Sequence, residues 1–424
     1  MLLLASKILL VFIAVVCVIH YGALFLFLAK IRRDEWKKPD RKFTPKTMVL
    51  LTLRGADPFL NRCVEGLLKQ DYPNYDVRLI VDHPDDPALP VVRAIVEQYK
   101  AHNVEFLIVD RHYETCTLKC NSLCYAIETL DPSYEVIVIL DADTNPHPEW
   151  LRHLVEPLSD PRFAAATGHR WYIPDKQNPG SLVRYLWGAA ALVQLCLYRI
   201  AWGGSLALRR DLIEKGSLLT HWKTAFTDDA SIADSIKAVG GQTAIVSSLF
   251  MINRETCTLR SFHRWVTRQL LCAKLHHPAW FAVVLQSFLI TPPLLLCAGL
   301  MIAGLALRDG SLVWYNVASL ALYWLSVFGT LPIMEFFIRQ KLRQRGEPLR
   351  PWTVNQTLRT LAMIPVTQLV YTSAMIRLHF LRRVEWRGVW YEIGRDKTVK
   401  LVEYIPYAQV QREAVRQADE PVSL

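Results

Sequence analysis

The sequence predicts a doubly wound α/β domain held between membrane-embedded helices, and three observations point to it. Short, almost continuously apolar segments alternate with helical stretches through the middle of the chain, as in a parallel sheet covered on both faces. Long apolar segments lie near both ends. The 424 residues are 52% hydrophobic and 21% charged. That composition excludes a disordered chain, and the length excludes a small disulfide scaffold.

The N-terminal segment, residues 1–29, is expected to be a transmembrane anchor. Ile8 to Leu28 is an apolar run of about the 20 residues that cross a hydrocarbon core of about 30 Å. A secretory signal would be shorter and would end in a small-residue cleavage site. Residues 30–46 follow as a basic juxtamembrane linker, which favours a cytoplasmic position against anionic headgroups and an N-terminus outside. Its basic residues are Lys30, Arg32, Arg33, Lys37, Lys38, Arg41, Lys42 and Lys46.

Residues 281–380 are expected to form C-terminal transmembrane or interfacial helices. Basic residues between the second and third apolar segments mark the cytoplasmic side. The third segment is less apolar. It either spans, which puts the basic tail of residues 381–424 outside, or lies along the membrane interface. The three segments are Phe281 to Leu307, Leu312 to Met334 and Leu358 to Phe380.

The charge and the cysteines exclude other classes of site. Lys plus Arg is 49 and Asp plus Glu is 39, so the formal charge is +10, and most of the excess lies beside the membrane segments. No nucleic-acid module is recognisable, so no nucleic-acid partner is expected. The nine scattered cysteines indicate a reducing compartment. Cys116, Cys120 and Cys124 repeat every four residues, which favours a buried helical stripe over a metal site.

Residues 47–272 are expected to be the soluble catalytic domain. Ligands of doubly wound sheets bind outside the carboxyl ends of the strands, so chemistry is expected in the loops that follow the strands. The expected strands are Thr47 to Leu53, Val77 to Val81, Val104 to Val109 and Glu135 to Leu140. The expected helices are Asp57 to Gln70, Ala88 to Lys100, Leu118 to Glu128 and Ala230 to Val239.

Two acidic pairs stand out among these loops. Asp141 and Asp143 end a fully apolar strand, where two carboxylates suit Mg²⁺ or Mn²⁺ or, alternatively, a helix cap. Asp228 and Asp229 precede a helix, where they act either as a general base or as an N-cap with a first-turn acid. The Gly203-Gly204 pair just upstream favours close approach of backbone to a ligand, or a plain turn.

Taken in order, these motifs resemble the family 2 type of inverting, membrane-bound nucleotide-sugar glycosyltransferases, and above all the ceramide glucosyltransferase group. The resemblance runs over roughly residues 47 to 270. The matching motifs are Arg54-Gly-Ala-Asp57-Pro58, Gln70-Asp-Tyr-Pro-Asn-Tyr75, Asp85-Asp86-Pro-Ala88, Lys119-Cys-Asn121, Asp141-Ala-Asp143 and Thr227-Asp228-Asp229. In the tail, Glu385-Trp-Arg-Gly388 resembles the Trp-Arg-Gly segment of related membrane transferases.

The resemblance implies a GT-A fold, a UDP-sugar donor and a Mg²⁺ or Mn²⁺ ion. It implies that Asp143, aided by Asp141, holds the metal on the diphosphate, and that Asp229 is the catalytic base beside Asp228. Asp85 or Asp86 is expected near the uracil and ribose. The other residues that the resemblance assigns to the donor are Arg54, Asp57, Lys119, Asn121 and Asp141.

One segment departs from the family pattern of Gln or Arg, two residues, and Arg-Trp. In the register that keeps Arg268 in place, Trp265 takes the Gln position and Gln269 takes the Trp position. In the other register, Arg264-Trp265 lacks the leading Gln. Gly204, Arg264, Trp265, Arg268 and Gln269 are the expected acceptor and diphosphate contacts. The same helix also fits an interfacial helix that presents Arg and Trp to lipid headgroups.

The predicted function is transfer of one hexose from a UDP-sugar to a lipid, at the cytoplasmic face of an inner or plasma membrane. Ceramide, diacylglycerol, another membrane lipid or a polyprenyl phosphate fits a cleft beside basic, membrane-hugging segments. Two alternatives remain open. One is a processive polysaccharide synthase, which the small number of apolar segments disfavours. The other is a catalytically inactive membrane scaffold that keeps the fold, which the altered Arg/Trp segment favours and the retained acids oppose.

Overall fold

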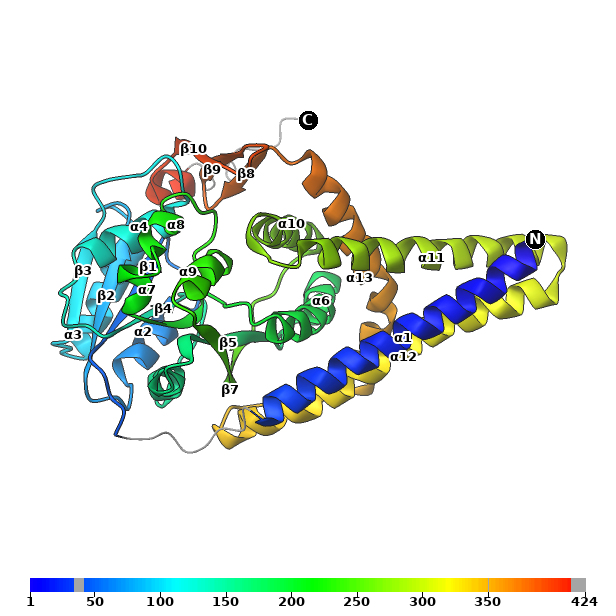
Figure 1. Cartoon of the computed structure of the whole chain (residues 1–424), viewed down its shortest axis with the longest axis horizontal. Helices are drawn as coiled ribbons and strands as arrows, with labels where there is room; N and C mark the ends of the chain where they lie inside the picture. The colour runs from blue at the N-terminus through cyan, green and yellow to red at the C-terminus, as the bar shows by residue number, and fades with distance from the viewer. Residues whose placement is uncertain (34–41, 350, 413–424) are drawn as a thin grey trace.

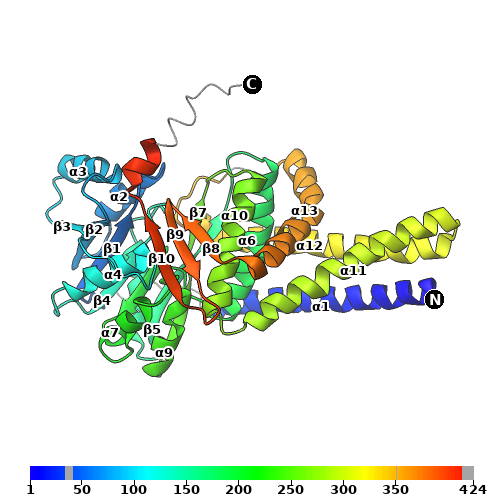
Figure 2. The same ribbon diagram turned by 90° about the horizontal axis from the view of Figure 1, so that it is seen from above.

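The computed structural model describes residues 1–33, 42–349 and 351–412. It shows an α/β domain from which a bundle of long helices projects (Figure 1, Figure 2). Part of the basic linker and the end of the basic tail lie outside the described residues, as do Lys37, Lys38, Arg41 and Arg350.

The domain is built on one sheet with the strand order β3-β2-β1-β4-β6-β5-β7. The first four strands in this order are parallel, β6 is antiparallel to both of its neighbours, and β7 is parallel to β5. The chain therefore winds outward from β1 and returns to β4, which makes a topological switch point between these two strands. The strands are β1 (Thr47–Leu53), β2 (Tyr75–Val81), β3 (Val104–Ile108), β4 (Val136–Leu140), β5 (Phe163–Tyr172), β6 (Ser205–Arg209) and β7 (Gln242–Asn253).

Helices cover both faces of the sheet, which explains why its central strands are apolar throughout. Val49 and Leu51 of β1 pack with α2, α3 and α5 on one face. Met48 and Leu50 pack with α4 and α8 on the other. The helices of the domain are α2 (Leu60–Leu68), α3 (Ala88–Gln98), α4 (Leu118–Glu128), α5 (Trp150–Val155), α7 (Asp211–Glu214), α8 (Leu218–Trp222) and α9 (Ala233–Ala238).

Most predicted elements of the domain are found, with shifted ends. Helix α4 has the predicted bounds. Its Cys120 and Cys124 are buried free thiols, as is Cys116 just before the helix. The helix predicted from Asp57 begins only at Leu60, because the Asp57 carboxylate accepts a hydrogen bond from the Phe59 amide in the preceding turn. The helix predicted over 230–239 is a short 3₁₀ turn, η2 (Ala230–Ile232), followed by α9.

The projecting bundle consists of α1 (Leu2–Arg33), α11 (Trp280–Leu307) and α12 (Gly310–Gln344). The N-terminus and the turn between α11 and α12 lie together at its far end (Figure 1). Helix α13 (Val354–Phe380) crosses the direction of the bundle at its base. Helices α6 (Pro179–Leu197) and α10 (Leu259–His276) fill the space between sheet and bundle. Among the described residues, α1, α6, α11, α12 and α13 are long and apolar enough to cross a membrane.

The basic tail is partly folded, which the sequence analysis did not predict. Its described residues form an antiparallel sheet of three strands in the order β10-β9-β8. This C-terminal sheet lies against the α/β domain (Figure 2). The strands are β8 (Arg383–Trp386), β9 (Val389–Ile393) and β10 (Val399–Tyr404).

Candidate active site

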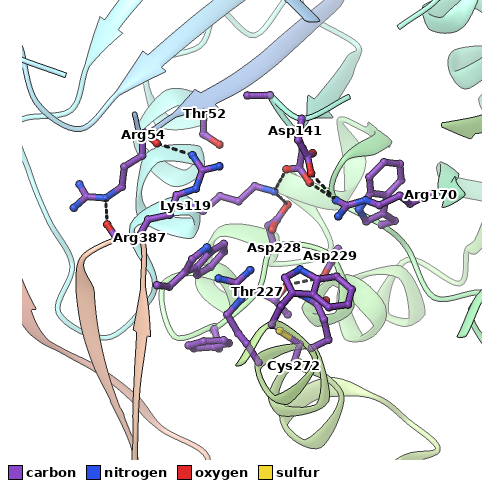
Figure 3. A pocket seen from close by; sticks show the side chains of 18 of the residues that line it. Thr52, Arg54, Lys119, Asp141, Arg170, Thr227, Asp228, Asp229, Cys272 and Arg387 are labelled. Atoms are coloured by element: carbon purple, nitrogen blue, oxygen red, sulfur yellow. Dashed lines mark hydrogen bonds and ion pairs between the residues drawn. The ribbon is translucent and has the colours of Figure 1, made fainter. Parts of the chain in front are cut away.

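A polar pocket of about 300 Å³ opens at the carboxyl edge of the sheet, next to the switch point between β1 and β4. Figure 3 shows its acidic and basic side chains turned toward one another. The predicted residues that line it are Arg54, Lys119, Asp141, Asp143, Asp228, Asp229, Trp265, Arg268 and Gln269. The acids that follow β4 and those that precede η2 therefore meet in one pocket, although almost 90 residues separate them in the sequence.

Lys119 joins the two acidic pairs at the centre of this pocket. Its Nζ lies 2.7 Å from Asp141 Oδ1 and 3.0 Å from Asp228 Oδ2 (Figure 3). Burial lowers the pKa of Lys119, but Asp141 and Asp228 outweigh burial and hold that pKa above its ordinary value. Lys119 therefore stays charged and fixes both carboxylates. Glycine is required at Gly203, since a Cβ there would overlap Asp228.

Asp143 carries a carboxylate oxygen that is available to a ligand, as does Asp82 on the same pocket wall. Its Oδ2 lies 3.5 Å from Arg170 and accepts a hydrogen bond from Asn253, whereas its Oδ1 is buried with no hydrogen-bond partner among the described residues. Burial, only partly offset by Arg170, raises the pKa of Asp143. A buried carboxylate that lacks a partner is suited to a cation.

This chemistry fits a divalent ion that is shared with a phosphate ligand. In the part of the chain that the structure describes, no three His, Cys, Asp or Glu side chains form a metal cage. Mg²⁺ does not need a cage of three protein side chains in such sites, because one or two carboxylates suffice when phosphate and water complete its coordination shell. Asp143 is the first candidate ligand. Asp141 is less available, since Lys119 and Arg170 lie at its two oxygens.

Asp229 is held rigidly at the inner end of the pocket. Its Oδ2 accepts a hydrogen bond of 3.1 Å from the Gly203 amide, and its Oδ1 accepts one of 2.5 Å from Thr227 Oγ1 and one of 2.6 Å from the Ala230 amide. It thus caps the 3₁₀ turn η2, as the structural interpretation of this pair expected. It also faces the pocket, as the functional interpretation requires.

Helix α10 turns three of the predicted contacts toward the pocket. Trp265, Arg268 and Gln269 line it, at the i, i+3 and i+4 positions of one helical face, whereas Arg264 does not. The structure thus favours the register of the altered segment that begins at Trp265. Among the described residues, Arg268 has no ion pair or hydrogen bond, and its guanidinium lies 4.7 Å from the centre of the Trp386 ring.

Several residues assigned to the donor do not line the pocket. Asp86 accepts hydrogen bonds from the Gly55 and Ala88 amides and so holds the loop between β2 and α3, while Asp85 is exposed. Asn121 bonds to the backbone of Arg111 and Tyr113 and shapes a loop. The remaining donor assignment outside the pocket wall is Asp57, which pairs with Arg387. Gly204, an expected acceptor or diphosphate contact, also lies outside the wall, and a Cβ added there would overlap Trp202.

Asp82, rather than Asp85 or Asp86, lines the pocket wall. It is the first residue after β2, and it forms an ion pair with Arg54. The sequence offered a signal for it, because Asp82 directly follows the buried end of β2, where parallel sheets place their ligand contacts.

The C-terminal sheet supplies further wall residues that sequence reasoning missed. Trp386, Arg387, Val389 and Tyr391 line the pocket. The Tyr391 hydroxyl accepts a hydrogen bond of 3.1 Å from the Leu118 amide at the start of α4. The pocket is therefore closed on one side by residues that follow all the long apolar helices in the sequence.

An apolar cavity of about 320 Å³ adjoins the polar pocket. It lies between α6, α10 and the helices of the bundle and is lined mainly by alanine, leucine, isoleucine and valine side chains. Residues that line both spaces form the boundary between them. They are Trp187, Ala191, Leu195, Trp202, Asp229, Gln269 and Cys272.

A polar pocket at the switch point of a doubly wound sheet, joined to an apolar cavity beneath long apolar helices, defines a membrane-bound sugar transferase. Residues 9–399 match glycosyl transferase family 21, and the chain belongs to that family. The GT-A class and the enzyme class that the resemblance implied are thereby confirmed, and the α/β sheet agrees with them.

Comparisons with individual proteins agree at low identity. The chain is 24% identical to the ceramide glucosyltransferase of Komagataella phaffii over 101 residues, which is 24% of this chain and 19% of that enzyme. It is 21% identical to the ceramide glucosyltransferase of Candida albicans over 123 residues, 26% of this chain and 22% of that enzyme. The matched segments thus span about a fifth of each yeast enzyme.

Solved structures show distant similarity. The mannosyltransferase PcManGT from Pyrobaculum calidifontis, in complex with GDP-Man and Mn²⁺, is 18% identical with a TM-score of 0.46, over 88% of this chain and 99% of its own. The glucosyl-3-phosphoglycerate synthase of Mycobacterium tuberculosis, in complex with Mn²⁺ and UDP-glucose, is 14% identical with a TM-score of 0.35, over 57% and 82%.

Proposed function

We propose that this glycosyltransferase moves one hexose from a UDP-sugar to a hydroxyl group of a membrane lipid, with inversion at the anomeric carbon. One observation carries the proposal: Asp229 lies on the boundary between the polar pocket and the apolar cavity. A charged donor and a hydrophobic acceptor need opposite surroundings, and their reacting groups must meet at one base.

The polar pocket suits the donor. Cationic side chains and a carboxylate with an unpartnered oxygen surround a space at the switch point, where dinucleotides and related ligands bind in such sheets. The nucleoside is assigned to the end near Asp82, and the diphosphate to the space between Arg54, Asp143 and Arg268. The choice of UDP follows from the family resemblance.

The apolar cavity suits a hydrocarbon chain of the acceptor. A dry cavity of about 150 Å³ accommodates a benzene molecule, so a space of about 320 Å³ accommodates roughly twice as many carbons. That volume corresponds to part of one lipid chain. The name of the two yeast relatives, ceramide glucosyltransferase, supports a sphingolipid-like acceptor.

The geometry supports a single displacement. A lipid hydroxyl is a weak nucleophile at neutral pH, and a positioned base that removes its proton accelerates such a step by about 10²–10⁴-fold. Asp229 is assigned this role, because three hydrogen bonds fix its carboxylate at the junction. Lys119 keeps the neighbouring carboxylates in place, and Arg268 is available for the leaving diphosphate. A divalent ion at Asp143, when bound, stabilises the charge of that leaving group.

The chain connections limit which helices cross the membrane. Helix α6 joins β5 to β6, which are neighbours in one sheet, so both of its ends lie on one side. Helix α13 leads into the C-terminal sheet, which contacts the α/β domain, so α13 also starts and ends on the domain side. We therefore assign the crossings to α1, α11 and α12. The basic residues at the end of α12 support a cytoplasmic position for the domain.

Replacing Asp229 by Asn tests the proposed base. The amide keeps the shape of the side chain but cannot accept a proton, so we expect turnover to fall by about 10²–10⁴-fold. The assay follows UDP release and radiolabelled glycolipid, with purified enzyme, UDP-[¹⁴C]glucose and ceramide in detergent. Asp234→Asn, on the exposed side of α9, is the matched control and should keep full activity. Near-normal turnover of Asp229→Asn would remove the assignment.

A further inference from the structure

The turn Trp386-Arg387-Gly388 links β8 to β9 and projects from the C-terminal sheet into the donor end of the pocket. Figure 3 shows Arg387 beside Arg54, on the side of the pocket opposite Arg170. The segment Glu385-Trp-Arg-Gly388 was part of the resemblance, but it follows the α/β domain at a long distance in the sequence and was given no role in the site. The contacts of this turn indicate that it belongs there.

The turn is fastened to the loop after β1 by reciprocal hydrogen bonds. Arg54 Nε donates to the Arg387 carbonyl at 2.9 Å, and Arg387 Nη1 donates to the Arg54 carbonyl at 2.6 Å. Arg387 Nη2 also lies 3.2 Å from Asp57 Oδ2. Two arginines that face a donor pocket are thereby held at fixed positions.

Other bonds of the C-terminal sheet reach the remaining loops of the same edge. The Tyr404 hydroxyl donates to the Asp82 carbonyl after β2 at 3.2 Å, and the Leu401 amide donates to the Glu114 carbonyl after β3 at 2.7 Å. A Cβ at Gly55 would overlap the Tyr407 ring, so the chain after β10 also lies close to the loop after β1. The sheet therefore covers the carboxyl edge at which the donor is assigned.

The backbone of the turn is unusual for an arginine. Arg387 has φ +51° and Gly388 has φ +77°, so both central residues of this two-residue turn have positive φ. Gly, Asn and Asp are the residues normally found in such turns, because a larger side chain pays roughly 1–2 kcal/mol for this conformation. A strained position that holds a long cationic side chain next to a pocket indicates a role for that side chain.

The cationic side chains around the turn are only partly balanced by carboxylates. Arg268 stacks on the Trp386 ring and has no ion pair among the described residues. Burial lowers the pKa of Arg268, and the nearby positive charges of Arg387 and Arg170 lower it further. Lys119 and Arg170 are already paired with Asp141 and its neighbours. Arg387 is paired with Asp57, so Arg268 is the cation of this set without a carboxylate partner, and Arg387 adds a second positive charge near it.

We propose that Arg387 and Arg268, placed on either side of Trp386, bind the diphosphate of the sugar nucleotide, so that the C-terminal sheet is part of the donor site. This inference rests on the proposed function, which supplies the donor. Two guanidinium groups match phosphate oxygens in geometry and charge. The donor then bridges the loops of the α/β domain and a sheet that follows the last bundle helices.

Binding of UDP and of uridine to the full-length protein in detergent tests the proposal. Calorimetry with Mn²⁺ should show a loss of UDP affinity of about ten- to hundredfold for Arg387→Ala, the range expected for removing a charge-assisted contact. Uridine affinity, measured by competition, should stay within about twofold of wild type because uridine carries no phosphate. Arg387→Lys should recover only part of the UDP affinity, because a lysine keeps the charge without the fork.

The control is Arg395→Ala, on the exposed turn between β9 and β10 of the same sheet, which should bind UDP normally. Thermal unfolding verifies that every variant is folded. Unchanged UDP affinity of Arg387→Ala overturns the inference, and so does an equal loss of UDP and uridine, which would mean that Arg387 only fastens the sheet. Failure of wild type to bind UDP, GDP or ADP overturns the inference together with the proposed donor.

Discussion

Asp228 and Asp229 show how two adjacent acids acquire different properties from their surroundings. Asp229 accepts three hydrogen bonds and reaches the boundary with the apolar cavity. Asp228 lies beneath it, buried against Lys119. Burial raises the pKa of Asp228 to about 6, with help from Asp229 and Asp141 and against the charge of Lys119. The same dipeptide thus holds a half-buried base candidate and a buried acid that anchors the central lysine.

The raised pKa of Asp228 predicts a pH-dependent effect of Asp228→Asn on stability. In the unfolded chain this carboxyl ionises near its ordinary pKa of about 3.9, whereas in the folded chain it keeps its proton until about pH 6. The folded state therefore binds more protons in this window, so the residue's contribution to stability falls as pH rises from about 4 to 6. Asparagine does not titrate. The variant should gain about 2–3 kcal/mol relative to wild type across that window.

Thermal unfolding of wild type and Asp228→Asn at pH 4 and pH 7 measures this difference. The quantity of interest is the change in their stability difference between the two pH values, which cancels the titration of all other groups. Asp234 is an exposed acid on α9, so the stability difference between Asp234→Asn and wild type should hardly change between the two pH values. An unchanged difference between the two pH values would contradict a raised pKa at Asp228.

Asp143 is predicted to make donor binding depend on a divalent ion. Its buried Oδ1 has no hydrogen-bond partner among the described residues, and Arg170, with a smaller contribution from Arg387, only partly offsets its charge. Asp143→Asn should therefore abolish most of the increase in UDP affinity that Mn²⁺ produces in wild type. Calorimetry with UDP in buffers that contain Mn²⁺ or EDTA measures this increase in UDP affinity. Equal affinities of wild type in the two buffers would exclude a metal role for this residue.

At the scale of elements, the buried strands and the helices with clear apolar faces could be predicted from the sequence. The central strands β1 and β4 are almost wholly apolar, since helices cover both sheet faces, and α4 begins at a Thr117 cap. Helix α6 was missed because, unlike an isolated span, it is mostly buried between sheet and bundle. The alternating apolar residues of β9 and β10 and the Arg387-Gly388 turn carried a signal for the C-terminal sheet.

The site could be predicted where a strand end or a helix start fixes the position of a side chain. Asp141 and Asp143 follow a strand end, Asp229 precedes the turn η2, and the three converge as expected. The sequence could not show that Asp86 lies outside the site, because its side chain is turned away by hydrogen bonds to two backbone amides of a loop. The altered segment of α10 keeps an indole and an amide on the pocket face. The departure from the family pattern, which favoured an inactive scaffold, therefore exchanges the positions of the indole and the amide on one face of α10.

Helix α6 offers a test of the acceptor cavity. Ala190 lines that cavity and not the polar pocket, so Ala190→Phe should fill the cavity and leave the donor site intact. We expect glycolipid formation to fall at least tenfold while UDP affinity stays within about twofold of wild type. Ala306→Phe, on the exposed end of α11, is the matched control. Normal glycolipid formation by Ala190→Phe would show that the acceptor chain lies elsewhere.

For the whole molecule, the position of the tail decides the membrane topology. If α13 crossed, the C-terminal sheet would lie on the far side from the α/β domain and could not bond to it. Instead Arg387 reaches Arg54, and Tyr391 reaches the start of α4. The interfacial alternative for this segment thus fits the structure. Three crossings then place the N-terminus and the turn between α11 and α12 together on the far side, as Figure 1 shows them at one end of the bundle.

Single added cysteines should report this topology in intact cells treated with a membrane-impermeant maleimide. We expect labelling of Gly310→Cys, in the open turn between α11 and α12, and protection of Gln98→Cys on α3 and Lys400→Cys on β10 until the cells are lysed. Background is low, because seven of the nine native cysteines are buried and Cys257 and Cys272 are half-buried. Since a donor site shared between domain and tail requires both on one side, labelling of Lys400→Cys in intact cells would contradict the topology and the shared donor site together.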